Sequence, residues 1–114
     1  MMDCVFCRIA SDEIPSDRVF ESEDVLAFRD LNPQAPTHVL VIPRRHVTSL
    51  EALGPEDGEL AHHLLQGIRE VAASEGLSER GYRVVTNIGD DGGQSVGHLH
   101  FHVLGGRKLT WPPG

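Results

Sequence analysis

Apolar residues recur every three or four positions between Pro55 and Gly76, which is the spacing of an amphipathic helix. The residues that share this face are Leu60, Leu64, Ile68, Val71 and Ala72. Pro55 suits the first position of a helix, and Gly76 suits a left-handed stop, after which Leu77 can pack back on the last turn. The pattern therefore predicts one long helix that begins at Pro55, ends before Gly76 and covers a sheet.

Shorter apolar runs bounded by turn residues predict strands. These runs cover residues 18–21, 25–29, 38–42, 82–87 and 98–104. The first two flank the turn residues 22–24 and are expected to form a hairpin, and Pro43 ends the third. A short helix is expected over residues 4–10. This order of elements predicts an α+β fold with an antiparallel sheet, one long helix and a short N-terminal helix.

The composition is that of a globular protein, with 39% hydrophobic and 24% charged residues in 114 positions. This length suits one domain, which we expect to span residues 1–114. The first residues lack the basic start and apolar run of a signal peptide, and the longest aliphatic run elsewhere is Val39–Ile42. We therefore expect no contact with a membrane and a cytoplasmic location.

The charge balance argues against a nucleic-acid partner. Ten basic residues against seventeen acidic ones give a net charge of −7, which repels polyanions at long range. The basic cluster Arg44-Arg45-His46 is short, and a solvated turn explains it. An anionic ligand would therefore have to be bound by local contacts.

Candidate chemistry concentrates in the last predicted strand. Side chains alternate between the two faces of a strand, so His98, His100 and His102 are expected to share one face, while the residues between them face the core. Imidazoles arranged in this way suit either metal binding or nucleophilic and acid–base catalysis. The preceding loop, Asn87–Ser95, is rich in glycine, amide and hydroxyl groups that can bind phosphate, although the same composition also suits a plain turn.

The histidine strand resembles the signature of the histidine triad (HIT) family, in which histidines alternate with hydrophobic residues. The segments that carry the resemblance are Cys4–Ile9, Asp30–His38, Val41–His46, Asp91–Ser95, His98–Leu104 and Trp111–Gly114. They extend over nearly the whole chain. The resemblance implies the HIT-like fold and a homodimer whose sheet continues from one subunit into the other.

The terminal Trp-Pro-Pro-Gly segment is similar to the purine nucleoside phosphoramidase branch, the histidine triad nucleotide-binding proteins. The resemblance implies hydrolysis of the P–N bond of purine nucleoside 5′-phosphoramidates, or of aminoacyl-type adenylates, through a nucleotidyl-histidine intermediate that releases a nucleoside monophosphate. A dinucleoside polyphosphate hydrolase is the first alternative. A nucleotide-responsive binding or scaffold protein with incidental catalysis is the second.

The resemblance also assigns roles to residues. His100 matches the nucleophile, His102 and Ser95 match residues that contact phosphate and leaving group, and His38 completes the histidine cluster. Among the substrate-binding positions, Asp30 matches the ligand of the ribose hydroxyls. From the residues alone, a turn role before Asn32-Pro33 is the alternative for Asp30. The other positions that we expect to contact substrate are Phe28 and Leu31 for the purine, Asn87, Gly93 and Gln94 for phosphate, and Trp111 for the leaving group in a partner's site.

The spacing of Cys4 and Cys7 allows two thiolates to bind one tetrahedral ion. A dithiol redox pair and two inert buried cysteines are the alternatives, but the βαβ pattern around a thioredoxin-like pair is missing. Some members of the family carry zinc on matching cysteines and histidines. The catalytic histidines and the adjacent pair His62-His63 of the predicted helix are set aside. His46 and His98 then remain as ligands. We therefore expect a structural zinc ion on these four residues and no cofactor requirement for catalysis.

Overall fold

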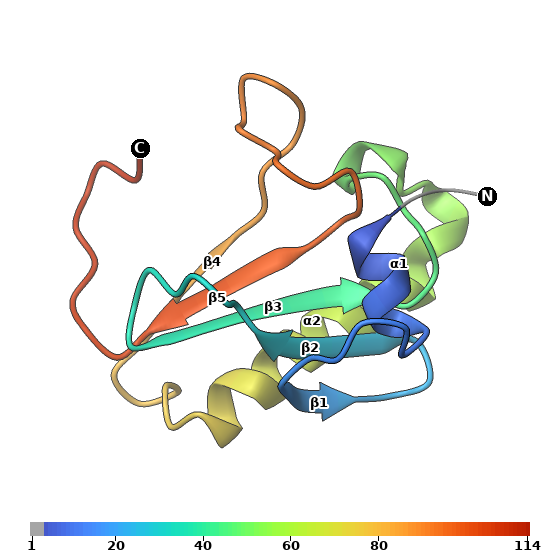
Figure 1. Cartoon of the computed structure of the whole chain (residues 1–114). Helices are drawn as coiled ribbons and strands as arrows, with labels where there is room; N and C mark the ends of the chain where they lie inside the picture. Colours follow the sequence, from blue (N-terminus) through green and yellow to red (C-terminus); the bar gives the residue numbers. More distant parts are fainter. Residues whose placement is uncertain (1–3) are drawn as a thin grey trace.

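The computed structural model describes residues 4–114 and shows a sheet covered by a helix on each face (Figure 1). The expected domain starts at residue 1, which lies outside the described residues. The elements found within residues 4–114 are α1 (Val5–Ala10), β1 (Arg18–Glu21), β2 (Val25–Arg29), β3 (Thr37–Pro43), the 3₁₀ turns η1 (Leu50–Ala52) and η2 (Pro55–Asp57), α2 (Gly58–Ser74), β4 (Arg83–Val85) and β5 (Phe101–Gly105).

The sheet formed by the described residues has the order β1-β2-β3-β5-β4, and every neighbouring pair is antiparallel. Alternation along each strand builds two cores, one on each face. Val39, Val41 and Val103 pack towards α2, whereas Leu40 and Ile42 pack towards α1. The predicted α+β class, the antiparallel sheet and the two helices are confirmed.

Helix α2 buries the predicted apolar face against the sheet. Leu64, Ile68, Val71 and Ala72 are buried, and Leu60 packs at the margin of the core. The helix ends as predicted, because Gly76 has a φ of 74° and the Leu77 amide donates to the Ala72 carbonyl at 2.8 Å.

The end of α2 packs directly against the end of β5. Leu77 is buried, and a Cβ atom at Gly105 would lie only 2.7 Å from Leu77 Cδ2. The absence of a side chain at Gly105 therefore allows the helix end and the strand end to approach one another.

Three elements differ from the predictions by two residues or more at one end. The helix begins at Gly58, because Pro55–Asp57 form a 3₁₀ turn. The strand predicted over 82–87 is shorter, since backbone pairing ends at Val85 and the Thr86 hydroxyl donates to the His100 carbonyl at 2.9 Å.

The strand predicted over 98–104 begins only at Phe101. Its partner β3 stops at Pro43, and the Leu99 amide instead donates to the Val47 carbonyl, at 2.6 Å, in the segment that follows β3. Among residues 4–114, none of the helices has the length and apolar character needed to cross a membrane.

Candidate active site

The three triad histidines share one face although only His102 belongs to β5. The ring centroids of His100 and His102 are 5.1 Å apart. The ring centroid of Phe6 lies 5.8 Å from that of His98 and 5.1 Å from that of His100. On the opposite face, Leu99, Phe101 and Val103 contribute to the core beneath α2. The predicted alternation is therefore present, and it begins before the strand does.

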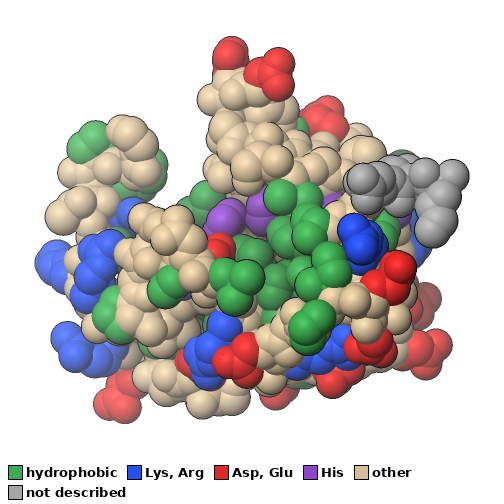
Figure 2. Space-filling view, viewed as in Figure 1, with side chains coloured by type: hydrophobic (Ala, Val, Ile, Leu, Met, Phe, Trp, Pro, Cys, Tyr) green, Lys and Arg blue, Asp and Glu red, His purple; other side chains and the backbone are tan. Residues whose placement is uncertain are grey.

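His100 and His102 line a cleft of about 340 Å³. Its apolar wall combines residues of α1, β2, β3 and the adjoining loops: Phe6, Ile9, Ile14, Phe28, Leu40 and Val96. Asp30, Leu31 and Ser95 complete the rim near the histidines. Figure 2 shows histidine side chains at the edge of an apolar patch on this face. The cleft therefore has an apolar wall and a polar, histidine-lined end, which together suit a ring system attached to a polar group.

The tautomer of His100 follows from one contact with the backbone. Its Nδ1 lies 2.7 Å from the His98 carbonyl oxygen, which can only accept a hydrogen bond. Nδ1 of the neutral ring must therefore carry the proton. The lone pair is left on Nε2, as a nucleophilic imidazole requires.

A second chain of hydrogen bonds fixes His38 and His102. The Gln34 amide donates to His38 Nδ1 at 3.0 Å, so His38 Nε2 carries the proton and donates to His102 Nδ1 at 2.8 Å. His102 in turn keeps its proton on Nε2 and can donate it to a ligand. The Asp30 carboxylate lies 3.4 Å from His38 Nε2 and completes the cluster.

Burial keeps these two imidazoles neutral near pH 7. It lowers the pKa of His102 to about 4, with the nearby His100 and His38 acting in the same direction and Asp30 opposing them. Burial also lowers the pKa of His38, again opposed by Asp30. The tautomers of His38 and His102 therefore apply in the physiological pH range.

The glycine-rich loop contributes one of its expected residues to the cleft. Ser95 lines it, whereas Asn87, Gly93 and Gln94 do not. The Gln94 side chain donates to the Thr48 carbonyl at 2.7 Å and accepts from the Gly89 amide at 3.0 Å, and the Gly93 amide donates to the Asp90 carbonyl. These groups hold the loop together and present Ser95 at its end.

The position of Asp30 agrees with both roles considered from the sequence, the turn residue and the substrate-binding residue. Its Oδ1 accepts from the Asn32 amide at 2.8 Å, as a turn residue does, and the residue also lines the cleft. Phe28 is buried edge-on against Phe6 with ring centroids 5.6 Å apart, whereas Leu31 is 99% exposed at the rim. An isolated side chain with this exposure becomes buried only when a ligand or partner covers it.

Trp111 lies outside the cleft of its own chain and is 79% exposed. The C-terminal segment that carries it runs along the end of the molecule opposite α1 (Figure 1). Within one chain, the structure therefore does not bring Trp111 to the histidines.

Sequence reasoning missed the apolar wall formed by Phe6, Ile9, Ile14 and Leu40. A signal was present, because Phe6 lies between the two cysteines and Ile9 follows one turn later in the same short helix. It missed the Gln34 amide as well, and no signal was available there, since a backbone N–H is present at almost every residue.

Cys4, Cys7, His46 and His98 form a separate cluster beside the cleft, here called the metal centre. The four donor atoms lie within 4.8 Å of one another. Sγ of Cys4 is 3.3 Å from His98 Nδ1, and Sγ of Cys7 is 3.3 Å from His46 Nδ1. Both cysteines are free, so no disulfide joins them.

The donor set of the metal centre fits a metal ion. His98 Nε2 donates to the Pro43 carbonyl at 2.9 Å, which leaves the Nδ1 lone pair directed to the sulfur atoms. Burial and the Cys4 thiol raise the pKa of Cys7 to about 11, so an ion must displace its proton. Two thiolates and two imidazoles can hold a metal ion in four-coordinate geometry.

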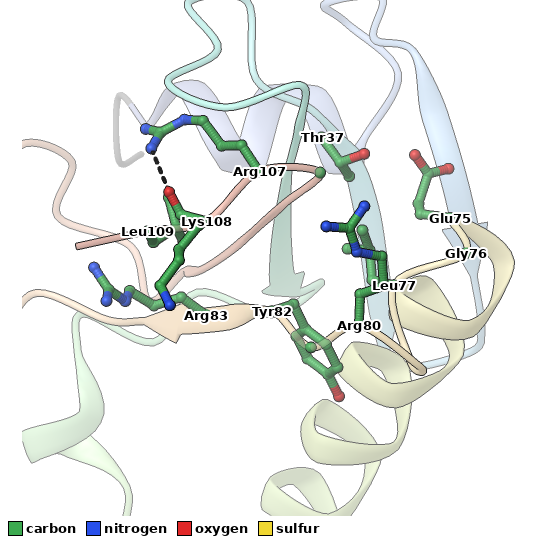
Figure 3. Close-up of a pocket in the computed structure, with 12 residues that line it drawn as sticks. Thr37, Glu75, Gly76, Leu77, Arg80, Tyr82, Arg83, Arg107, Lys108 and Leu109 are labelled. Carbon is green, nitrogen blue, oxygen red and sulfur yellow. Dashed lines mark hydrogen bonds between the residues drawn. The ribbon is translucent and has the colours of Figure 1, made fainter. Parts of the chain in front are cut away.

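A second cavity, of about 590 Å³, lies at the far end of β5 (Figure 3). The cationic side chains around it are Arg80, Arg83, Arg107 and Lys108. Neither histidine nor cysteine is among its lining residues, so it lacks the nucleophile of the first cleft. Arg107 donates to the Gln34 carbonyl at 2.9 Å and thereby supports the loop whose amide orients His38.

Comparison with known proteins agrees with this geometry. The HIT domain profile matches residues 11–109. An uncharacterized HIT-like protein from Synechococcus elongatus is 52% identical over 112 residues, which are 98% of this chain and 97% of that protein.

Two solved structures show the same fold. The crystal structure of a HIT family hydrolase from Legionella pneumophila is 51% identical, with a TM-score of 0.96 over 98% of this chain and 100% of that one. The histidine triad nucleotide-binding protein from Candida albicans is 31% identical, with a TM-score of 0.83 over 98% of this chain and 85% of that one. On its sequence, its sheet and its histidine face together, the chain belongs to the HIT domain family and is similar to HIT family hydrolases.

Proposed function

We propose that the chain is a purine nucleoside phosphoramidase, which cleaves the P–N bond of nucleoside 5′-phosphoramidates or the P–O bond to the acyl group of related aminoacyl-type adenylates. The observation that carries this proposal is the pair of fixed tautomers, with a lone pair on His100 Nε2 beside a proton on His102 Nε2. The first group can attack phosphorus, and the second can donate to a phosphoryl oxygen. Both rings line the same cleft.

The reaction proceeds by covalent catalysis in two displacements. His100 Nε2 forms a bond to the α-phosphorus while the P–N bond to the leaving amine breaks, and that amine takes a proton from water through the Ser95 hydroxyl. His102 Nε2–H stabilises the charge on the phosphoryl oxygens. Water then attacks the same phosphorus, the bond to His100 breaks, one proton returns to solvent, and a nucleoside monophosphate is released.

The cleft also fits the nucleoside part of the substrate. Its apolar wall, including Phe28, suits a purine ring, and Leu31 at the rim would be covered by such a ring. The Asp30 carboxylate is a suitable acceptor for ribose hydroxyls. The name of the Candida albicans relative, a nucleotide-binding protein, supports a nucleotide ligand.

Acid quenching during turnover of adenosine 5′-phosphoramidate tests the covalent step. We expect mass spectrometry to find adenylate on the peptide that contains His100, because His100 has the available lone pair. We also expect kcat/KM to be higher for this substrate than for a diadenosine polyphosphate. Label on another residue would refute the mechanism, and the reverse substrate ratio would favour a dinucleoside polyphosphate hydrolase.

For the metal centre we propose zinc, which prefers four nitrogen and sulfur ligands. The ion would join the first turn of α1 to the His46 and His98 segments, so it stabilises the fold and takes no part in bond breaking. The donor set of two thiolates and two imidazoles supports this choice over metals that prefer oxygen ligands.

Elemental analysis of protein purified without chelator is expected to find about one zinc ion per chain. The Cys4→Ser/Cys7→Ser variant should contain none, and His62→Ala, an exposed histidine of α2, should keep its zinc. Removing the ion should lower the Tm by several degrees. Wild-type protein that stays empty after zinc supplementation would rule out the site.

We further propose a homodimer in which the sheet continues through β4. This strand lies at the edge of the sheet, and its apolar residue Val84 is 42% exposed. Pairing of β4 with a second copy would cover Val84 and bring Trp111 towards the partner, because Arg83 of β4 donates to the carbonyl of the adjacent Thr110. We expect sedimentation equilibrium to give a dimer for wild type and a monomer for Val84→Glu; a monomeric wild type would contradict the proposal.

A further inference from the structure

We propose that the metal centre positions the catalytic nucleophile, so that loading the ion accelerates formation of the nucleotidyl-histidine as well as stabilising the fold. This inference rests on the proposed function and assigns a second role to His98. It also makes Phe6, a residue with no reactive group, a positioning residue for His100.

His98 connects the two sites through three of its polar groups. Its Nδ1 lies 3.3 Å from Cys4 Sγ and 3.6 Å from Cys7 Sγ, its Nε2 donates to the Pro43 carbonyl, and its own carbonyl oxygen accepts from His100 Nδ1 at 2.7 Å. The residue has no exposed surface. A ligand bond at Nδ1 therefore restrains the residue whose carbonyl determines the His100 tautomer.

Phe6 provides a second connection. It lies between Cys4 and Cys7 in the first turn of α1, and its ring contacts both His98 and His100 edge-on. Fixing the two sulfur atoms on one ion fixes this turn and with it the ring. The ring then limits the rotation of His100 about its side-chain bonds.

The chemical consequence concerns which nitrogen carries the proton. With the His98 carbonyl held in place, His100 keeps its proton on Nδ1 and its lone pair on Nε2. Without the ion, His98 Nδ1 has only weak contacts with thiol groups, and the carbonyl is held less firmly. The opposite tautomer, with the proton on Nε2, then gains population, and it cannot attack phosphorus.

Two readouts on the same preparation test this coupling. Wild-type protein is stripped with a chelator, and part of it is then reloaded with zinc. The stripped and reloaded forms are compared by ¹⁵N NMR of the His100 ring and by the single-turnover rate of nucleotidyl-histidine formation. We expect zinc to raise the population with the proton on Nδ1 and to raise the rate by roughly 10-fold to 100-fold, as second-shell contacts do at other sites. Val71→Ala, a core substitution in α2 away from the metal centre, controls for loosening of the fold.

The variant Phe6→Leu tests the second connection with zinc still bound. We expect normal zinc content, a smaller rate and a mixed His100 tautomer, whereas Val71→Ala should keep the wild-type tautomer. Equal rates and equal tautomers for stripped and reloaded protein would overturn the inference while leaving the proposed function intact. Absence of the covalent intermediate in both forms would instead overturn the proposed function.

Discussion

Replacement of His100 by alanine is expected to reduce turnover of adenosine 5′-phosphoramidate by on the order of 10³-fold or more. The substitution removes the nitrogen that forms the covalent bond, and no other described imidazole has the same fixed tautomer in the cleft. Binding of adenosine monophosphate should remain measurable by calorimetry, because the apolar wall and Asp30 are unchanged. Steady-state kcat measurements therefore separate the chemical step from ligand binding.

His62→Ala is the matched control for this variant. His62 is exposed on α2, on the opposite side of the sheet from the cleft, and its loss should leave turnover unchanged. Wild-type turnover by the His100 variant would show that another group attacks phosphorus, and the assigned mechanism would then be wrong.

Acidification is expected to destabilise the protein through His102. Its pKa is about 4 in the folded state, below the ordinary value of 6.5, so the unfolded chain takes up the proton first as the pH falls. The free energy of unfolding should therefore decrease between pH 6.5 and 4, with the full contribution present above this range. We expect the loss attributable to His102 to be about 2 kcal/mol, reduced because the ring is only partly buried.

Urea unfolding at a series of pH values measures this effect, with His102→Gln as the control. Glutamine has no titrating group, so the variant should lose less stability than wild type across the same interval. His38, whose pKa burial also lowers, titrates in both proteins, so the difference between them reports the loss of the His102 titration together with any change at its hydrogen-bond partner His38. Parallel curves for wild type and variant would show that His102 is not held neutral by the fold.

The sequence predicted those features that depend on regular repetition. The face of α2 follows from the spacing of Leu64, Ile68 and Val71, and its end follows from the backbone freedom of Gly76. The boundaries of β4 and β5 did not follow, because they depend on contacts with distant segments. Leu99 pairs with Val47 rather than with β3, and such a pairing has no local signature.

The candidate site likewise has features that the sequence predicted and features that it did not. The histidine face was predictable because one short segment carries it, and the four residues of the metal centre were predicted and come together as a set. Of the cleft wall only Phe28 was predicted, since its other residues, such as Phe6 and Leu40, come from different elements. The tautomers were also beyond sequence reasoning, because a backbone carbonyl and a backbone amide determine them.

Gly105 has a consequence for anyone who wishes to transplant the histidine face to another scaffold. A side chain there would displace the buried Leu77 side chain, so the strand and the helix end should be grafted together. A graft that keeps the helix end but enlarges residue 105 would force Leu77 to repack. The smallest portable unit is therefore the strand with the turn at residues 76–77, and not the histidine motif by itself.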